Sequence, residues 1–93
     1  MHCGWLGETS GVYYVYLLET VSRPKQRYIG YTSDLRSRLR AHNDGKLPNT
    51  ARYRPWALAT YLAFSSKCQA LAFEGYLKTG SGYAFSRKRL WPT

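Results

Sequence analysis

The chain has 93 residues, which is the length of one small domain with a single hydrophobic core. Apolar residues make up 44% of it and aromatic residues 16%, a composition that predicts a folded chain rather than a disordered one. Fourteen Lys and Arg residues oppose five Asp and Glu residues, for a formal net charge of +9. This charge favours nucleic acid as the partner, and a purely structural or protein-interaction domain would leave it unexplained.

The sequence also disfavours several classes of protein. It contains no apolar run of about 18 residues, so no transmembrane span is predicted, and no long basic amphipathic helix that would bind a membrane surface. Residues 1–11 lack the features of a signal peptide and predict a flexible tail. Cys3 and Cys68 are too few for a disulfide framework and lack the spacing of a metal site. We therefore expect a cytoplasmic protein with one domain at residues 12–91.

The predicted elements begin with a hairpin. Residues 12–20, VYYVYLLET, are β-branched and aromatic, and predict a strand. A turn at 22–25, SRPK, precedes a returning strand at 26–32. Nine tyrosines against three phenylalanines are more than core packing needs, although for any single strand tyrosine core packing remains the better explanation.

A short helix is expected after the hairpin, at residues 34–43. Thr32 or Ser33 can cap its start, and Gly45 can end it. The following segment, 47–55, is polar and irregular, with room for one helical turn.

The rest of the chain predicts one strand and two helices. Residues 56–64, WALATYLAF, form the third strand. Ser65 or Ser66 caps a helix that Gly80 ends, and residues 83–91 form a short basic helix. The order ββαβαα predicts an α+β fold, a small three-stranded antiparallel sheet flanked by helices.

Strand alternation groups the hairpin tyrosines. Tyr14 and Tyr16 share one face of the first strand, and Tyr28 shares a face with Gly30 in the second. We expect Gly30 to leave open surface beside Tyr28. A buried phenol hydroxyl needs a partner, so several tyrosines on one face indicate that their hydroxyls are used.

The helix after the hairpin carries two unusual residues. Leu35 and Leu39 lie one turn apart and should be buried. Arg38 and His42 lie on or beside the same stripe, where a charged side chain needs a partner or a purpose. A guanidinium beside a tyrosine-lined sheet would suit a phosphate. A second set of basic residues is expected to face outward and bind nucleic acid loosely: Arg36, Arg40, Lys46, Arg87 and Lys88.

The later helix carries an isolated acid. Ala70, Phe73 and Leu77 form its apolar stripe, and Glu74 lies beside them. After Asp44, Glu74 is the only acid, among eight Lys and Arg residues. It could pair with a nearby cation, or it could hold a divalent metal ion together with waters and phosphate oxygens.

In their order and spacing these residues resemble the motif of the GIY-YIG nucleases. YVY at 14–16 and YIG at 28–30 resemble its two halves. Arg38 follows ten residues after the second tyrosine, His42 a turn later, and Glu74 lies in AFEGYLK of the second long helix. The resemblance covers about residues 12–90, and it is greatest to small single-domain bacterial members.

The resemblance implies a metal-dependent endonuclease that cleaves DNA, of the kind used in DNA repair, directed by structure rather than sequence. Glu74 would hold Mg²⁺ or Mn²⁺, Arg38 would neutralise the phosphate, and Tyr16, close to Tyr28, would take a proton from the attacking water while His42 relays or orients it. A tyrosine pKa near 10 would have to fall by about 3 units, roughly 4 kcal/mol, and we expect Arg38 and the metal to lower it.

Two departures from the family pattern keep an alternative open. The first motif reads YVY rather than GIY, which retains Tyr16. The late asparagine of many family nucleases is missing from KTGSGYAFSRKRL, although Ser81 lies in that segment. The alternative is a nucleic-acid-binding module with a degenerate, non-catalytic site. With so little surface, specificity would come from nucleic-acid shape or from a recognition partner protein.

Overall fold

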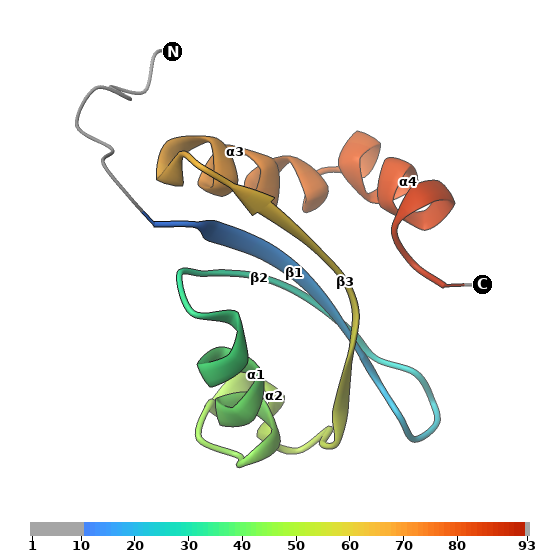
Figure 1. Ribbon diagram of the computed structural model, residues 1–93. Helices are drawn as coiled ribbons and strands as arrows, with labels where there is room; N and C mark the ends of the chain where they lie inside the picture. The colour runs from blue at the N-terminus through green and yellow to red at the C-terminus, as the bar shows by residue number, and fades with distance from the viewer. Residues whose placement is uncertain (1–10, 93) are drawn as a thin grey trace.

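A three-stranded antiparallel sheet organises the computed structural model, which describes residues 11–92 (Figure 1). The strands are β1 (Tyr13–Thr20), β2 (Arg27–Thr32) and β3 (Trp56–Phe64). Their order is β2-β1-β3, so β1 is central and both of its neighbours are edge strands. Residues 1–10, which hold most of the expected tail and Cys3, lie outside the described part of the chain.

Helices cover both faces of this sheet. Helices α1 (Leu35–Asn43) and α2 (Pro48–Ala51) lie on one face, and α3 (Lys67–Leu77) and α4 (Gly80–Arg89) lie on the other (Figure 1). The predicted α+β architecture is confirmed. Helix α2 is the single helical turn for which the otherwise irregular segment 47–55 had room.

The two faces of β1 supply separate cores because its side chains alternate. The core under α3 and α4 contains Val15, Leu17, Ala70, Leu77 and Trp91. The core under α1 and α2 contains Tyr16, Leu18 and Trp56. The central strand therefore buries a tyrosine where a purely structural strand would hold an aliphatic residue.

The start of α1 differs from the prediction. Asp34 is the N-cap, and its carboxylate accepts a hydrogen bond from the Ser37 backbone N–H at 3.1 Å. Thr32, an expected cap, instead accepts from the Asp34 backbone N–H at 3.0 Å and so orients the turn before the helix. Gly45, with φ +76°, follows the end of α1 as expected.

The boundary between α3 and α4 also differs. Gly80 starts α4 rather than ending α3, because Thr79 caps α4 by accepting from the Gly82 N–H at 3.1 Å. A Cβ at Gly82 would lie 1.8 Å from the backbone oxygen of Tyr76. The two helices therefore meet at a distance that only glycine permits.

Leu35 and Leu39 are half-buried, whereas full burial was predicted. They pack on the Tyr16 core, but one side of each borders an open cavity of about 470 Å³ between α1 and β3. Tyr14 and Tyr61, whose ring centroids are 5.9 Å apart, line the same cavity. The helix consequently leaves part of the sheet uncovered.

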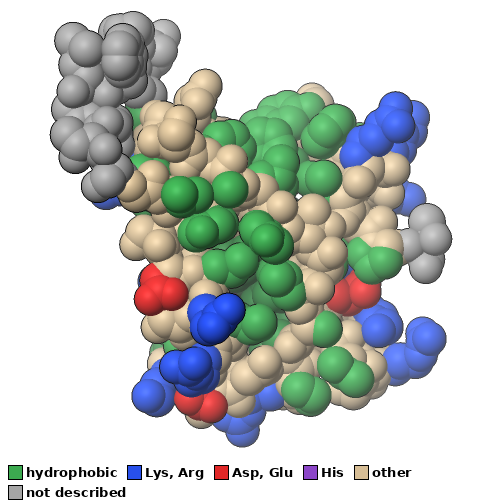
Figure 2. Space-filling model, viewed as in Figure 1, with side chains coloured by type: hydrophobic (Ala, Val, Ile, Leu, Met, Phe, Trp, Pro, Cys, Tyr) green, Lys and Arg blue, Asp and Glu red, His purple; other side chains and the backbone are tan. Residues whose placement is uncertain are grey.

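Charge is distributed around an apolar band on the face drawn in Figure 2. Hydrophobic side chains run through the centre of this face, and Lys and Arg side chains gather below, over α1 and α2, and at the upper right, over α4. Among the described residues, no helix has the length and hydropathy needed to cross a membrane.

Candidate active site

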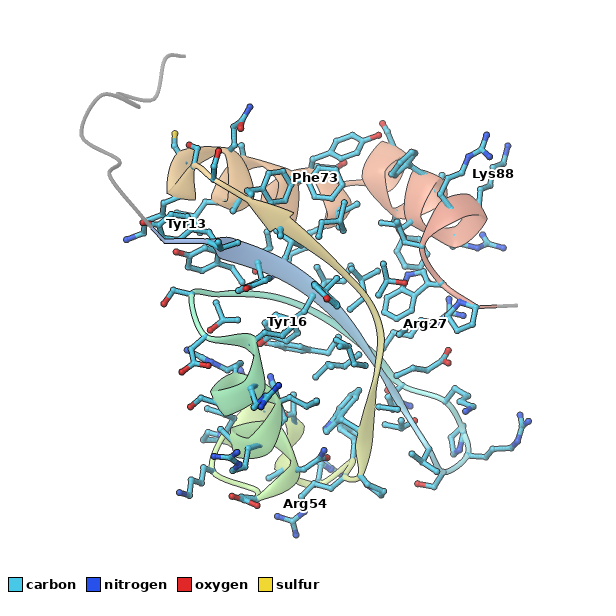
Figure 3. The ribbon with its side chains drawn as sticks, viewed as in Figure 1. Tyr13, Tyr16, Arg27, Arg54, Phe73 and Lys88 are labelled. Atoms are coloured by element: carbon cyan, nitrogen blue, oxygen red, sulfur yellow. The ribbon has the colours of Figure 1, made fainter. Side chains whose placement is uncertain are left out.

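Tyr16 forms the centre of the candidate site. It lies on the side of β1 that faces α1 and α2, whereas Phe73 lies across the sheet with α3 (Figure 3). The Tyr16 side chain is 1% exposed and pairs in register with Gly30. A Cβ at Gly30 would lie 2.5 Å from Tyr16 Cζ and 2.9 Å from Tyr28 Cε2. The expectation that Gly30 leaves open surface was wrong, because the Tyr16 ring fills that space.

A buried hydrogen-bonded chain joins Tyr16 to α1 and α2. The Tyr16 hydroxyl lies 2.9 Å from His42 Nε2, and His42 Nδ1 lies 2.7 Å from Thr50 Oγ1. The Thr50 hydroxyl in turn donates to the Leu47 carbonyl at 3.5 Å. This order of donors assigns the proton to His42 Nδ1 and leaves Nε2 as the acceptor for the Tyr16 hydroxyl.

Aromatic rings enclose this chain. The Tyr28 ring centroid lies 5.0 Å from that of His42 and 6.2 Å from that of Tyr16. Trp56 packs against both Tyr28 and His42, and its indole N–H donates to the Thr50 carbonyl at 2.9 Å. Sequence reasoning missed Thr50 and Trp56. Neither has a local signal for this role: Thr50 reaches the site through the turn of α2, and Trp56 reaches it from the first position of β3.

Burial sets the protonation of the two central groups. Burial and then the charge of Arg38 lower the pKa of His42 below its usual 6.5, so the imidazole is neutral near pH 7. Burial, followed by Tyr28 and the Glu74 carboxylate, raises the pKa of Tyr16, while Arg38 acts in the opposite direction. The expected lowering of the Tyr16 pKa was therefore wrong for the protein alone, because desolvation outweighs the nearby guanidinium.

The lowered His42 pKa predicts a stability change with pH. Below the ordinary histidine pKa of 6.5, the unfolded chain binds a proton that the folded chain excludes, so stability should fall as pH drops from neutral through 6.5 and further into the acid range. Thermal unfolding across this range should show a steeper loss for the wild type than for His42→Gln, which carries no titratable group there. Parallel pH profiles of the two proteins would contradict the assignment of a buried, neutral imidazole.

Arg38 is placed on the same side of the sheet as Tyr16. It lies on the exposed surface of α1, yet its charge acts on both Tyr16 and His42. It makes no ion pair with any residue in 11–92. The guanidinium therefore lies within electrostatic range of the tyrosine–histidine pair and is available to an anion.

Glu74 occupies the other side of the sheet, on α3. Its side chain is 20% exposed, and its carboxylate pairs with Lys78 Nζ at 3.1 Å. Its charge nevertheless acts on the Tyr16 phenol, because α3 packs on both β1 and β2. Glu74 therefore has the cation partner that was one of its two expected roles, and its charge also lies within range of the site.

The residues present suit a hydrated divalent ion but not a protein cage. No cluster of three or more His, Cys, Asp or Glu side chains occurs among the described residues. Mg²⁺ is commonly bound by one or two carboxylates, with waters and substrate phosphate oxygens completing its shell. Glu74 fits that pattern as a single ligand, since its partner Lys78 is 54% exposed and can turn away into solvent.

The outward-facing basic residues form two groups rather than one. Arg36 and Arg40 lie exposed on α1, with Lys46 just beyond its end. Arg87 and Lys88 lie exposed on α4, across the sheet, where Figure 3 shows Lys88 pointing away from the molecule. All five are accessible, but no single surface contains them.

Known proteins share sequence with most of this chain. The family model described as the GIY-YIG catalytic domain matches residues 12–85. UPF0213 proteins of Streptococcus pyogenes serotypes M3 and M1 are each 46% identical over 66 residues, which is 70% of this chain and 70% of each relative. A UPF0213 protein of serotype M5 is 44% identical over the same shares of both chains. No solved structure gave a significant match.

Proposed function

Because the chain belongs to the GIY-YIG catalytic domain family, we propose that it is a divalent-metal-dependent endonuclease that hydrolyses phosphodiester bonds of DNA. The observation that carries this proposal is the buried hydrogen bond between Tyr16 and His42 at 2.9 Å. This pair occupies positions in a small core that apolar side chains could fill, and its fully satisfied hydrogen bonds hold the tyrosine and the histidine in one fixed arrangement. Arg38 and Glu74, whose charges both act on Tyr16, supply the remaining groups.

In this mechanism Arg38 holds the scissile phosphate. A guanidinium presents planar paired donors that match two phosphate oxygens, and its fixed charge stabilises the negative charge that develops there. The exposure of Arg38 lets a nucleic-acid strand approach from solvent, while its position on α1 keeps the phosphate beside Tyr16 and Tyr28.

Tyr16 and His42 move the proton. The attacking water gives a proton to the Tyr16 oxygen as the Tyr16 hydroxyl proton passes to His42 Nε2, so a phenolate need not accumulate. The lowered pKa of His42 keeps Nε2 free to accept, and Thr50 holds the ring in the required tautomer. Hydroxide then bonds to phosphorus, the bond from phosphorus to the leaving oxygen breaks, and that oxygen takes up a proton from solvent. The His42 imidazolium returns its proton to Tyr16 as the Tyr16 hydroxyl proton passes to solvent, which restores the starting state.

Glu74 would hold the divalent ion, Mg²⁺ or Mn²⁺. A bound ion of this kind supplies Lewis-acid stabilisation of the phosphate and of the leaving oxygen. The protein's contribution is a single carboxylate that can exchange the Lys78 ammonium for the ion.

The substrate is proposed to be recognised by shape. The basic residues fall into separate groups on α1 and α4, which suits contacts to backbone phosphates rather than to base edges. A partner protein could add sequence selection, and such selectivity by shape is consistent with a role in DNA repair.

Tyr16→Phe tests the proton-transfer proposal. Only a hydroxyl is lost, so the fold should persist, although His42 Nε2 loses its partner and unfolding should require about 1–2 kcal/mol less. Cleavage should slow on the order of 100-fold, and its rise with pH should flatten. The rate at which each protein nicks supercoiled plasmid should be measured across pH, with circular dichroism as the control for folding. Wild-type rates in the variant would remove Tyr16 from the mechanism.

A second candidate function is a nucleic-acid-binding module that does not cut. Two observations favour it. The Glu74 carboxylate is already neutralised by Lys78, and the raised pKa of Tyr16 makes its phenol harder to deprotonate. It predicts salt-sensitive binding of DNA with no metal-dependent cleavage of any substrate.

A further inference from the structure

We infer that a pocket at the β2 edge of the sheet binds a backbone phosphate of nucleic acid next to the one that is cut, an inference that rests on the proposed function. This edge pocket, of about 290 Å³, lies between β2 and the helices α3 and α4. Besides Tyr28 of the candidate site, its polar lining consists of Arg27, Lys78, Tyr83 and Trp91. None of these four residues has a role in the chemistry proposed above, apart from the pairing of Lys78 with Glu74.

The Trp91 side chain carries a donor without an acceptor. The residue is 5% exposed, and its indole Nε1–H is buried with no hydrogen-bond partner among residues 11–92. Such an orphaned donor is uncommon because it loses water without a replacement. The Arg27 guanidinium lies 4.6 Å from the centroid of the indole ring and holds it against the sheet. Indole can only donate, and a phosphate oxygen in the pocket would supply the missing acceptor once a small rotation of the ring brings the buried Nε1–H to the pocket surface.

The cations of the edge pocket have donors to spare. Arg27 Nε donates to the Glu19 carboxylate and Lys78 Nζ to the Glu74 carboxylate, each at 3.1 Å. Each of these contacts uses one N–H group, and the remaining guanidinium and ammonium hydrogens can face an anion. The Tyr83 hydroxyl adds a neutral donor, since this residue is 43% exposed. Every polar side chain that lines the pocket is thus a donor, and none of the lining residues is acidic.

The pocket also adjoins the candidate site. Tyr28 lines it and at the same time packs against His42, with ring centroids 5.0 Å apart. Because β2 is an edge strand, a nucleic-acid strand can pass around it from the α1 face to the α4 side, where Arg27 lies in Figure 3. When Glu74 gives up its pair, the Lys78 ammonium already lines the pocket and can turn to the phosphate.

The indole N–H of Trp91 reports occupancy directly. In ¹⁵N-labelled wild-type protein with EDTA present, a short oligodeoxynucleotide should shift this resonance, which Trp91→Phe identifies by its disappearance. The shift should saturate together with overall binding, and inorganic phosphate alone should move it in the same direction at higher concentration. The Trp56 indole, which already donates to Thr50, is the internal control and should move less. A Trp91 resonance that stays fixed while the oligonucleotide binds would overturn the inference.

Matched arginine variants give a second measurement. Arg27→Gln should weaken oligonucleotide binding about 10-fold and reduce the slope of log affinity against log salt by about 0.9, the value for one lost phosphate contact. Tyr83→Phe should weaken it about 3-fold, as expected for one lost neutral hydrogen bond. Arg89→Gln, an exposed arginine of α4 outside the pocket, is the control. Equal losses in both arginine variants would count against the pocket, whereas failure of every form to bind would instead reject the proposed function.

Discussion

Replacing Glu74 with Gln is expected to abolish metal-dependent cleavage while leaving DNA binding intact or tighter. The substitution keeps the size of the side chain but removes the negative charge that a divalent ion needs as its ligand. It also removes a charge that repels phosphate and releases the Lys78 ammonium. Plasmid nicking in Mg²⁺ and Mn²⁺ measures the first effect, and fluorescence anisotropy with labelled DNA in EDTA measures the second.

Glu19→Gln is the matched control for this substitution. Glu19 is also a largely buried glutamate in an ion pair, with Arg27 at 3.1 Å, but its charge does not act on Tyr16 or His42. Its variant should cut DNA at a rate close to that of the wild type. If Glu74 serves only as a partner for Lys78, its replacement should lower the melting temperature and leave cleavage unchanged, which would contradict the proposed role.

Arg38→Ala is expected to slow cleavage on the order of 100-fold or more, equivalent to about 2.7 kcal/mol of transition-state stabilisation. The side chain is exposed and unpaired among the described residues, so its removal should change the stability of the fold little. Single-turnover rates at saturating protein separate this effect from weaker binding.

Two further variants separate geometry from charge. Arg36→Ala removes an exposed arginine from the same helix and should lower the rate only a few-fold, through weaker binding. Arg38→Lys keeps the charge but not the paired planar donors, and should recover only part of the lost rate. Equal effects of Arg36→Ala and Arg38→Ala would mean that α1 contributes charge alone.

Much of the candidate site was predictable because it depends on local periodicity. Alternation along the hairpin placed Tyr16 on one face of β1, and the register of a short hairpin brought Tyr16 opposite Gly30. The helical repeat placed His42 toward the core, where it is fully buried. Ser66, one of the two predicted caps of α3, is confirmed, and it could be predicted because it lies directly before the helix.

The remainder depends on contacts between distant segments, which no local pattern encodes. Thr50 reaches His42 only because α2 folds back onto α1. The half-buried state of Leu35 and Leu39 reflects a cavity between α1 and β3, and the direction of the Tyr16 pKa reflects how completely the two layers desolvate it. The Lys78 partner of Glu74 is different, because it is an i,i+4 contact that helical spacing alone could have predicted.

Cleavage by the purified wild-type protein tests the central claim most directly. Supercoiled plasmid, a branched duplex and a single-stranded oligonucleotide should each be incubated with Mg²⁺, with Mn²⁺ and with EDTA. The account predicts metal-dependent cutting of at least one of these substrates, absent in EDTA and absent for Glu74→Gln at equal DNA occupancy. Saturated binding of all three substrates with no metal-dependent cutting of any would contradict it, and would identify the chain as a nucleic-acid-binding module.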